Sequence, residues 1–147
     1  MATICVERVI AADPTSTALL LAGPTAFDLW PGVTRVAPGL VEASVPALVA
    51  RAARVRVRAL PPRRLPTSYV TRFSFSGDGL PATEGAVTLT YAVADGVPVA
   101  TGAALSLTWE PAGTAAERAR VTAAFRAMAV GFLANLAAAA ESRADAA

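Results

Sequence analysis

The chain has 147 residues, of which 54% are hydrophobic and 16% charged, and its formal net charge is +2. That length predicts a single domain spanning residues 1–147 that needs no disulfide or metal ion to fold. The sequence contains no His and no Lys, which excludes a Ser-His-Asp triad, His-bound zinc or iron, Schiff-base chemistry and a phosphate-binding P-loop, so we expect no metal site and no cofactor.

The first part of the chain predicts one strand followed by two short helices. Residues 3–10 are rich in β-branched side chains and alternate apolar with polar positions, which is typical of a strand. Asp13 and Pro14 predict the N-cap and the first residue of a helix that ends before Pro24. Pro24 then opens a second short helix over residues 25–29.

The middle of the chain predicts successive strands joined by Pro and Gly turns. The predicted strands cover residues 33–37, 40–45, 53–60, 68–76, 86–94 and 99–109. The dipeptide Asp95-Gly96 is a strong signal for a hairpin turn between the last two. The segment 46–52 is compatible with a loop, a strand or a helical turn.

The last third predicts one long helix. Thr114 can cap it, with Glu117 three residues later as in a capping box. Large apolar residues recur at helical spacing and form one face: Val121, Phe125, Met128, Phe132 and Leu136. An antiparallel sheet with one apolar face needs such a helix as its cover. We therefore expect an α+β fold, with a curved antiparallel sheet of about seven strands around the C-terminal helix.

Alternation along the predicted strands separates inward from outward side chains. The residues expected to face the helix are Val57, Tyr69, Phe73, Leu89, Tyr91, Leu107 and Trp109. Arg54, Arg56, Arg58 and Arg72 fall on the opposite face. The inward Tyr hydroxyls and the Trp109 indole need hydrogen-bond partners, and a mainly apolar space with a few polar groups is the usual form of a small-molecule site.

Three local features, together with the order of elements, match a known superfamily. Residues 9–14 lead from strand to helix through Ala-Ala-Asp-Pro, residues 27–33 contain a Trp-Pro-Gly-Val turn, and the last helix carries Phe125, Met128 and Phe132. Over nearly its whole length the chain resembles the START/SRPBCC helix-grip superfamily. That superfamily holds START lipid-transfer domains, birch-pollen-type plant allergens and bacterial polyketide cyclase/dehydrase-like proteins.

The resemblance implies a hydrophobic, polyketide-like or lipid-like ligand in an internal cavity, with cyclisation or dehydration as an activity of some members. The candidate ligand-binding residues are Trp30, Val57, Tyr69, Phe73, Leu89, Tyr91, Leu107, Trp109, Phe125, Met128, Phe132 and Asn135. If the chain is an enzyme, Tyr69 or Tyr91 would polarise a carbonyl and Arg8 would be the charged group inside, while the cavity aligns the reacting carbons.

Structural interpretations of the same residues stay open. Tyr69 and Tyr91 are also typical core aromatics, Trp30 a plug as well as a gate, and Arg8 a strand-end residue that reaches water. Asn135 can lie on a solvated flank.

The outward arginines fit a solvated sheet face or a docking surface for an acidic partner such as an acyl carrier protein. Alternative functions are a non-catalytic carrier or sequestering resistance protein, and an interaction module that uses this arginine face.

Charge and hydropathy bear on partners and location. A net charge of +2 argues against nucleic-acid binding, which needs basic residues clustered on one face. The N-terminal residues 1–8 carry charge where a signal peptide is apolar, and Arg126, Gly131 and Asn135 interrupt the apolar run 123–140. We therefore expect a cytoplasmic protein without an integral membrane segment, as a monomer or homodimer. The single cysteine, Cys5, cannot form an internal disulfide.

Overall fold

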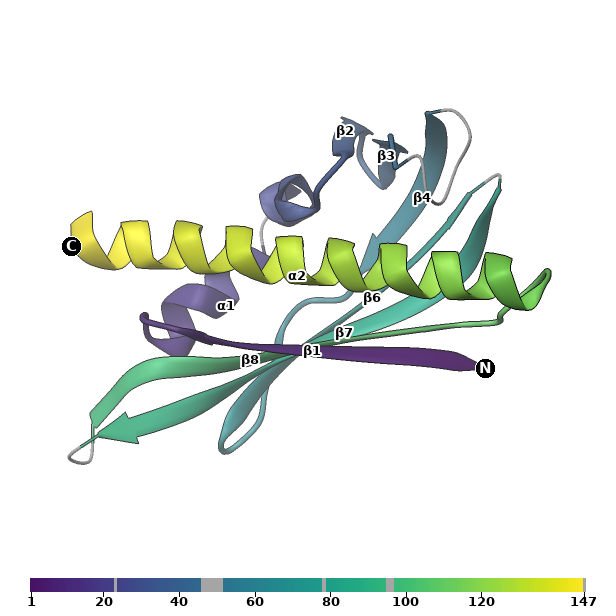
Figure 1. Ribbon diagram of the computed structural model, residues 1–147. Coiled ribbons are helices and arrows are strands. Elements are labelled where there is room, and N and C mark those ends of the chain that lie inside the picture. Colours follow the sequence, from purple (N-terminus) through teal and green to yellow (C-terminus); the bar gives the residue numbers. More distant parts are fainter. Residues whose placement is uncertain (23, 46–51, 78, 95–96, 147) are drawn as a thin grey trace.

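A curved antiparallel sheet wraps around one long helix, α2 (Ala115–Ala146), which crosses the inner face of the sheet (Figure 1). The computed structural model describes residues 1–22, 24–45, 52–77, 79–94 and 97–146. The other elements are β1 (Ala2–Ile10), α1 (Pro14–Ala22), the 3-10 helix η1 (Pro24–Leu29), β2 (Val33–Ala37), β3 (Leu40–Ala43), β4 (Ala53–Ala59), β5 (Arg63–Arg64), β6 (Ser68–Gly77), β7 (Leu80–Ala94) and β8 (Val97–Trp109).

The strands form one 8-stranded sheet in the order β1-β8-β7-β6-β4-β3-β2, with β5 paired to β6. This confirms the predicted α+β fold. The additional strand is β5, whose Arg64 pairs with Tyr69 of β6. Its sequence lies between prolines and lacks the alternation that predicts a strand. In addition, β7 begins at Leu80, well before the predicted residue 86, and β3 ends at Ala43.

The predicted caps are formed. One carboxylate oxygen of Asp13 accepts a hydrogen bond of 2.9 Å from the Ser16 backbone N–H, and the other accepts one of 2.7 Å from the Ser16 hydroxyl. At the start of α2, the Glu117 backbone N–H donates to the Thr114 hydroxyl at 3.2 Å. The second short helix is a 3-10 helix. The predicted turn at Asp95-Gly96 and the ambiguous segment 46–51 lie outside the described residues.

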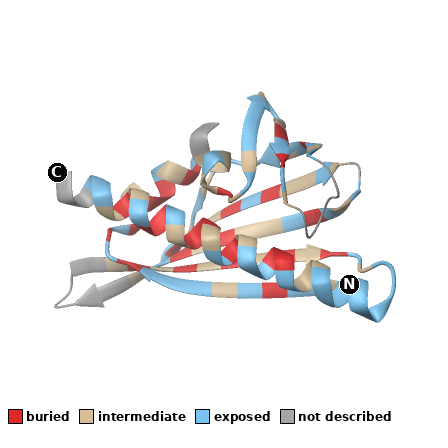
Figure 2. Cartoon of the chain, turned by 45° about the horizontal axis from the view of Figure 1, so that its top comes forward, coloured by how far each residue is buried: buried red, intermediate tan, exposed pale blue. Residues whose placement is uncertain are grey.

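Burial follows the predicted alternation. More and less buried positions alternate along the strands (Figure 2). Phe73, Leu89, Leu107 and Trp109 are buried in the core, whereas the four arginines of the opposite parity are exposed. On α2 the buried stripe includes Phe125, Phe132 and Leu136, and small residues between them allow close approach to the sheet. Segment Ala115–Arg143 is long and apolar enough to cross a membrane, but half of its most apolar stretch is buried within the protein, as in a core helix.

Candidate functional site

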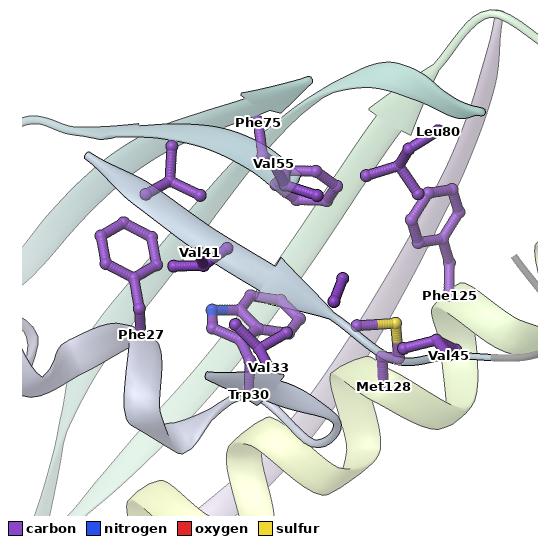
Figure 3. A pocket seen from close by; sticks show the side chains of 12 residues that line it. Phe27, Trp30, Val33, Val41, Val45, Val55, Phe75, Leu80, Phe125 and Met128 are labelled. Atoms are coloured by element: carbon purple, nitrogen blue, oxygen red, sulfur yellow. The ribbon is translucent and has the colours of Figure 1, made fainter. Parts of the chain in front are cut away.

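An apolar cavity of about 40 Å³ lies between α2 and the end of the sheet formed by β2, β3 and β4 (Figure 3). Its lining comes from elements that are far apart in the sequence. The lining residues are Phe27, Trp30, Val33, Val41, Ala43, Val45, Val55, Val57, Phe75, Leu80, Phe125 and Met128. Among these described residues none has a titratable side chain, and the only side-chain heteroatoms are the Trp30 indole nitrogen and the Met128 sulfur.

The register of the strands brings together the side chains that form one wall of this cavity. Val41 and Val55 are direct partners in the β3–β4 ladder, and both are almost fully buried. Phe75 is the partner of Val57 in the β4–β6 ladder. Because partners in a ladder project to the same face, these side chains form one continuous apolar surface. Phe125 of α2 closes the opposite side.

Trp30 occupies the centre of the space beneath α2 and is 8% exposed. Its ring centroid lies 4.5 Å from that of Phe132, and Phe73 meets it edge-on at 5.6 Å. Trp30 and Phe27 also line a second, smaller cavity of about 20 Å³. That cavity is lined by Leu21, Ala26, Phe27, Trp30, Ala59, Thr71, Phe73, Val87 and Phe132. Trp30 and Phe27 are therefore the wall between two apolar spaces.

The turn that carries Trp30 is fastened to α2. The Asn135 side-chain amide donates a hydrogen bond of 2.8 Å to the Leu29 backbone carbonyl. The Trp30 backbone N–H donates to the Phe27 carbonyl at 3.2 Å. In addition, Gly131 of α2 faces the Pro31 ring so closely that an added Cβ would lie 2.4 Å from Pro31 Cγ. Asn135 thus positions the Trp30 turn, and its amide is engaged with the backbone.

The two tyrosines lie at the other end of the inner face, against the start of α1. The Tyr69 and Thr15 hydroxyls share a hydrogen bond of 3.1 Å. The ring centroids of Tyr69 and Tyr91 are 6.2 Å apart. The hydrogen bond with Thr15, then that with Tyr91, lowers the pKa of Tyr69. Interaction with the Tyr69 phenol raises the pKa of Tyr91. Both rings are half-buried, and neither belongs to the lining of the two cavities.

The remaining predicted site residues divide into three groups. Val57, Phe125 and Met128 line the larger cavity with Trp30. Phe73 and Phe132 line the smaller one. Leu89, Leu107 and Trp109 are buried in the core.

Arg8 lies on β1 opposite Ala103 and is exposed. Sequence reasoning did not assign Phe27, Val41 or Val55 to the site, although the alternation in β3 and β4 carried a signal for the two valines.

Solved structures share this architecture at low sequence identity. The ZhuI aromatase/cyclase from Streptomyces sp. R1128 has a TM-score of 0.67 and 14% identity, over 97% of this chain and 95% of that one. A START superfamily protein from Mycobacterium smegmatis has a TM-score of 0.61 and 12% identity, over 95% and 97%. The di-domain ARO/CYC StfQ from the steffimycin biosynthetic pathway has a TM-score of 0.55 and 18% identity, over 97% of this chain and 52% of that one.

No protein-family model and no curated protein sequence matches the chain. The structural similarity therefore defines the fold, which is the START/SRPBCC helix-grip fold. The resemblance that the sequence motifs indicated is confirmed at this level. Because one fold hosts many functions, the function has to be argued from the site itself.

Proposed function

We propose that this protein binds an apolar small molecule, polyketide-like or lipid-like, in the cavity beneath α2. The observation that carries the proposal is the chemistry of the lining. The described side chains around the larger cavity are apolar apart from the Trp30 indole nitrogen and the Met128 sulfur, and most of them come from η1, β2, β3, β4, β6, β7 and α2. A space with walls of this kind favours apolar ligands, because its side chains offer water almost no hydrogen-bond partner.

Ligand entry requires side chains to move. A volume of about 40 Å³ exceeds the space of one water molecule but is far below that of a drug-sized pocket. Trp30 separates this volume from the second cavity, so rotation of the indole would join the two spaces and free its own volume. Met128 can adapt as well, since its unbranched side chain has three rotatable bonds. In this proposal Trp30 acts as a plug in the free protein and as a gate during binding.

The lining also favours binding over catalysis. General acid–base chemistry requires a titratable group within hydrogen-bond reach of the reacting atoms. The described cavity linings contain none, and the tyrosine pair is engaged with Thr15 at the other end of the sheet. These observations support a carrier or sequestering role. Burying unpaired carbonyl groups in the larger cavity would cost binding energy, so the part of the ligand held there should be hydrocarbon.

The proposal can be tested with a bulky substitution inside the cavity and a matched one outside. The probes are 1-anilinonaphthalene-8-sulfonate, a saturated fatty acid and an anthraquinone, titrated against the purified protein with dye fluorescence and native mass spectrometry. Met128→Trp should fill the larger cavity and abolish probe binding. Val130→Trp lies on the same helix at a position that is 49% exposed, and it should bind like the wild type.

Two results would contradict the proposal. One is that none of the probes binds and that native mass spectrometry finds the bare chain without a co-purified compound. The other is equal binding by wild type and Met128→Trp, which would place the bound probe elsewhere. Circular dichroism of both variants checks that loss of binding is not loss of folding.

A further inference from the structure

The sheet face turned away from α2 carries a row of exposed arginines. They are Arg54, Arg56 and Arg58 from β4 and Arg72 from β6. We propose that this face, the arginine face, docks an acidic surface of a partner protein. The inference is independent of the ligand in the cavity, because it concerns the opposite side of the sheet.

The sheet holds these arginines in a defined pattern. Alternate residues of one strand project to the same side about 7 Å apart, so Arg54, Arg56 and Arg58 form a straight row. In the β4–β6 ladder, Arg56 pairs with Ser76 and Arg58 pairs with Ser74. Arg72, two residues before Ser74, extends the row diagonally from Arg58. The guanidinium groups therefore start from a rigid framework, with serine hydroxyls beside them.

Among the described residues, no acidic side chain forms an ion pair with the arginines of this row. In the described part of the chain, the ion pairs within 4.0 Å join Arg35 to Asp28 and the N-terminus to Glu110. Glu42 is the ladder partner of Arg54, and Glu84 is the partner of Ser74, yet neither forms such a pair with the row. Guanidinium groups that are exposed and that pair with none of the described carboxylates are available for bidentate hydrogen bonds to the carboxylates of a partner.

The arginine face is also hollowed. A groove of about 470 Å³ includes Arg56, Arg58 and Ser76, and an adjoining one of about 330 Å³ includes Arg58 and Arg72. The second groove also contains Leu60, which is 47% exposed. An exposed leucine in the same groove as two arginines offers an apolar contact beside charged groups, and protein–protein interfaces combine apolar and polar contacts in this way.

The charge pattern favours a protein partner over a nucleic acid or a membrane. Glu84 lies in both grooves, beside the arginines. A phosphate backbone or an anionic membrane carries uniform negative charge, so it would be repelled electrostatically by the Glu84 carboxylate. A protein surface can place its own carboxylates against the arginines and a basic or polar group against Glu84. Complementarity of this kind determines specificity and association rate.

The test uses two variants with the same change in net charge. The first replaces the row (R54Q/R56Q/R58Q/R72Q), and the control replaces four exposed arginines of α2 (R118Q/R120Q/R126Q/R143Q). The probe is a fluorescein-labelled amphipathic peptide with glutamates along one face and leucine beside them, followed by fluorescence anisotropy. We expect the row variant to lose about tenfold or more in affinity and the control to bind like the wild type. Binding should weaken as salt is raised.

Three outcomes would overturn the inference. Equal loss in both variants would show an effect of net charge alone. Tighter binding of single-stranded DNA of matched charge, or of anionic vesicles, would assign the face to a nucleic acid or a membrane instead. No binding of the acidic peptide by the wild type would remove the docking role. Melting temperatures of both variants provide the folding control.

Discussion

The indole of Trp30 lies against the ring of Phe132 on α2, with centroids 4.5 Å apart and planes inclined at 32°. This contact holds the indole within the lining of both cavities. With Trp30 in place, the space beneath α2 is two small cavities of about 40 and 20 Å³. We expect that removal of the indole would join the two spaces. The fold thus forms the apolar interior, and Trp30, together with Phe27, divides it into the two cavities.

Replacing Trp30 with Ala should destabilise the protein and enlarge the cavity. Loss of a buried Trp side chain costs about 3–5 kcal/mol in the free energy of unfolding, which urea denaturation measures. The same variant should bind 1-anilinonaphthalene-8-sulfonate more strongly while keeping its far-UV circular dichroism. Trp30→Phe retains an aromatic ring at this position, so its stability and its dye binding should lie between those of the wild type and those of Trp30→Ala. If Trp30→Ala bound the dye no more strongly than the wild type does, the indole would not separate the cavities.

The two tyrosines should titrate separately. The pKa of Tyr69 is lowered from its ordinary value of 10.0, first by the hydrogen bond with Thr15, whereas the pKa of Tyr91 is raised by the Tyr69 phenol. Tyr69 should therefore ionise first as the pH rises. Since the sequence contains only 2 Tyr, absorbance at the tyrosinate band can follow both steps. Thr15→Val should move the first step to higher pH, and Tyr69→Phe should bring Tyr91 back toward its ordinary value.

A contrary result would be a single transition for both phenols in the wild type. Thr15→Ser serves as the control, because it keeps the hydroxyl while removing one methyl group. If Thr15→Ser and Thr15→Val shifted the first transition equally, the hydrogen bond would not be the cause.

Replacing Gly131 with Ala should destabilise the protein, although Ala normally stabilises a helix relative to Gly by about 0.5–1 kcal/mol. The reason is the contact with Pro31, whose Cγ would lie 2.4 Å from the new Cβ. Either the turn that carries Trp30 or the helix has to move, at a cost of about 1–3 kcal/mol. Urea denaturation gives the sign of the change.

Ala127→Gly on the exposed side of the same helix gives the intrinsic difference between the two residues. If Gly131→Ala stabilised the protein by the amount that Ala127→Gly destabilises it, the contact between α2 and the Pro31 turn would have no energetic consequence. Increased dye binding in Gly131→Ala would link the same contact to the position of Trp30.

Most secondary structure could be predicted because its signals are local. The alternation around Arg72 and Phe73 has a period of 2, and the stripe from Phe125 to Leu136 has the helical period, so both predict burial without knowledge of the partner. Asp13 and Thr114 cap their helices through groups only a few residues away. The strand β5 could not be predicted in this way, because Arg63 and Arg64 become a strand only by pairing with β6.

The sequence by itself determined the order of the elements other than β5, the inner and outer faces of the strands and the apolar stripe of α2, since each of these depends on the chain's own periodicity. The tertiary structure alone decided which inner residues meet. It directed Tyr69 to Thr15, bound Asn135 to the Leu29 carbonyl and placed Trp30 between two cavities. Such contacts depend on how separate elements pack, and no local pattern of residues encodes the distance between them.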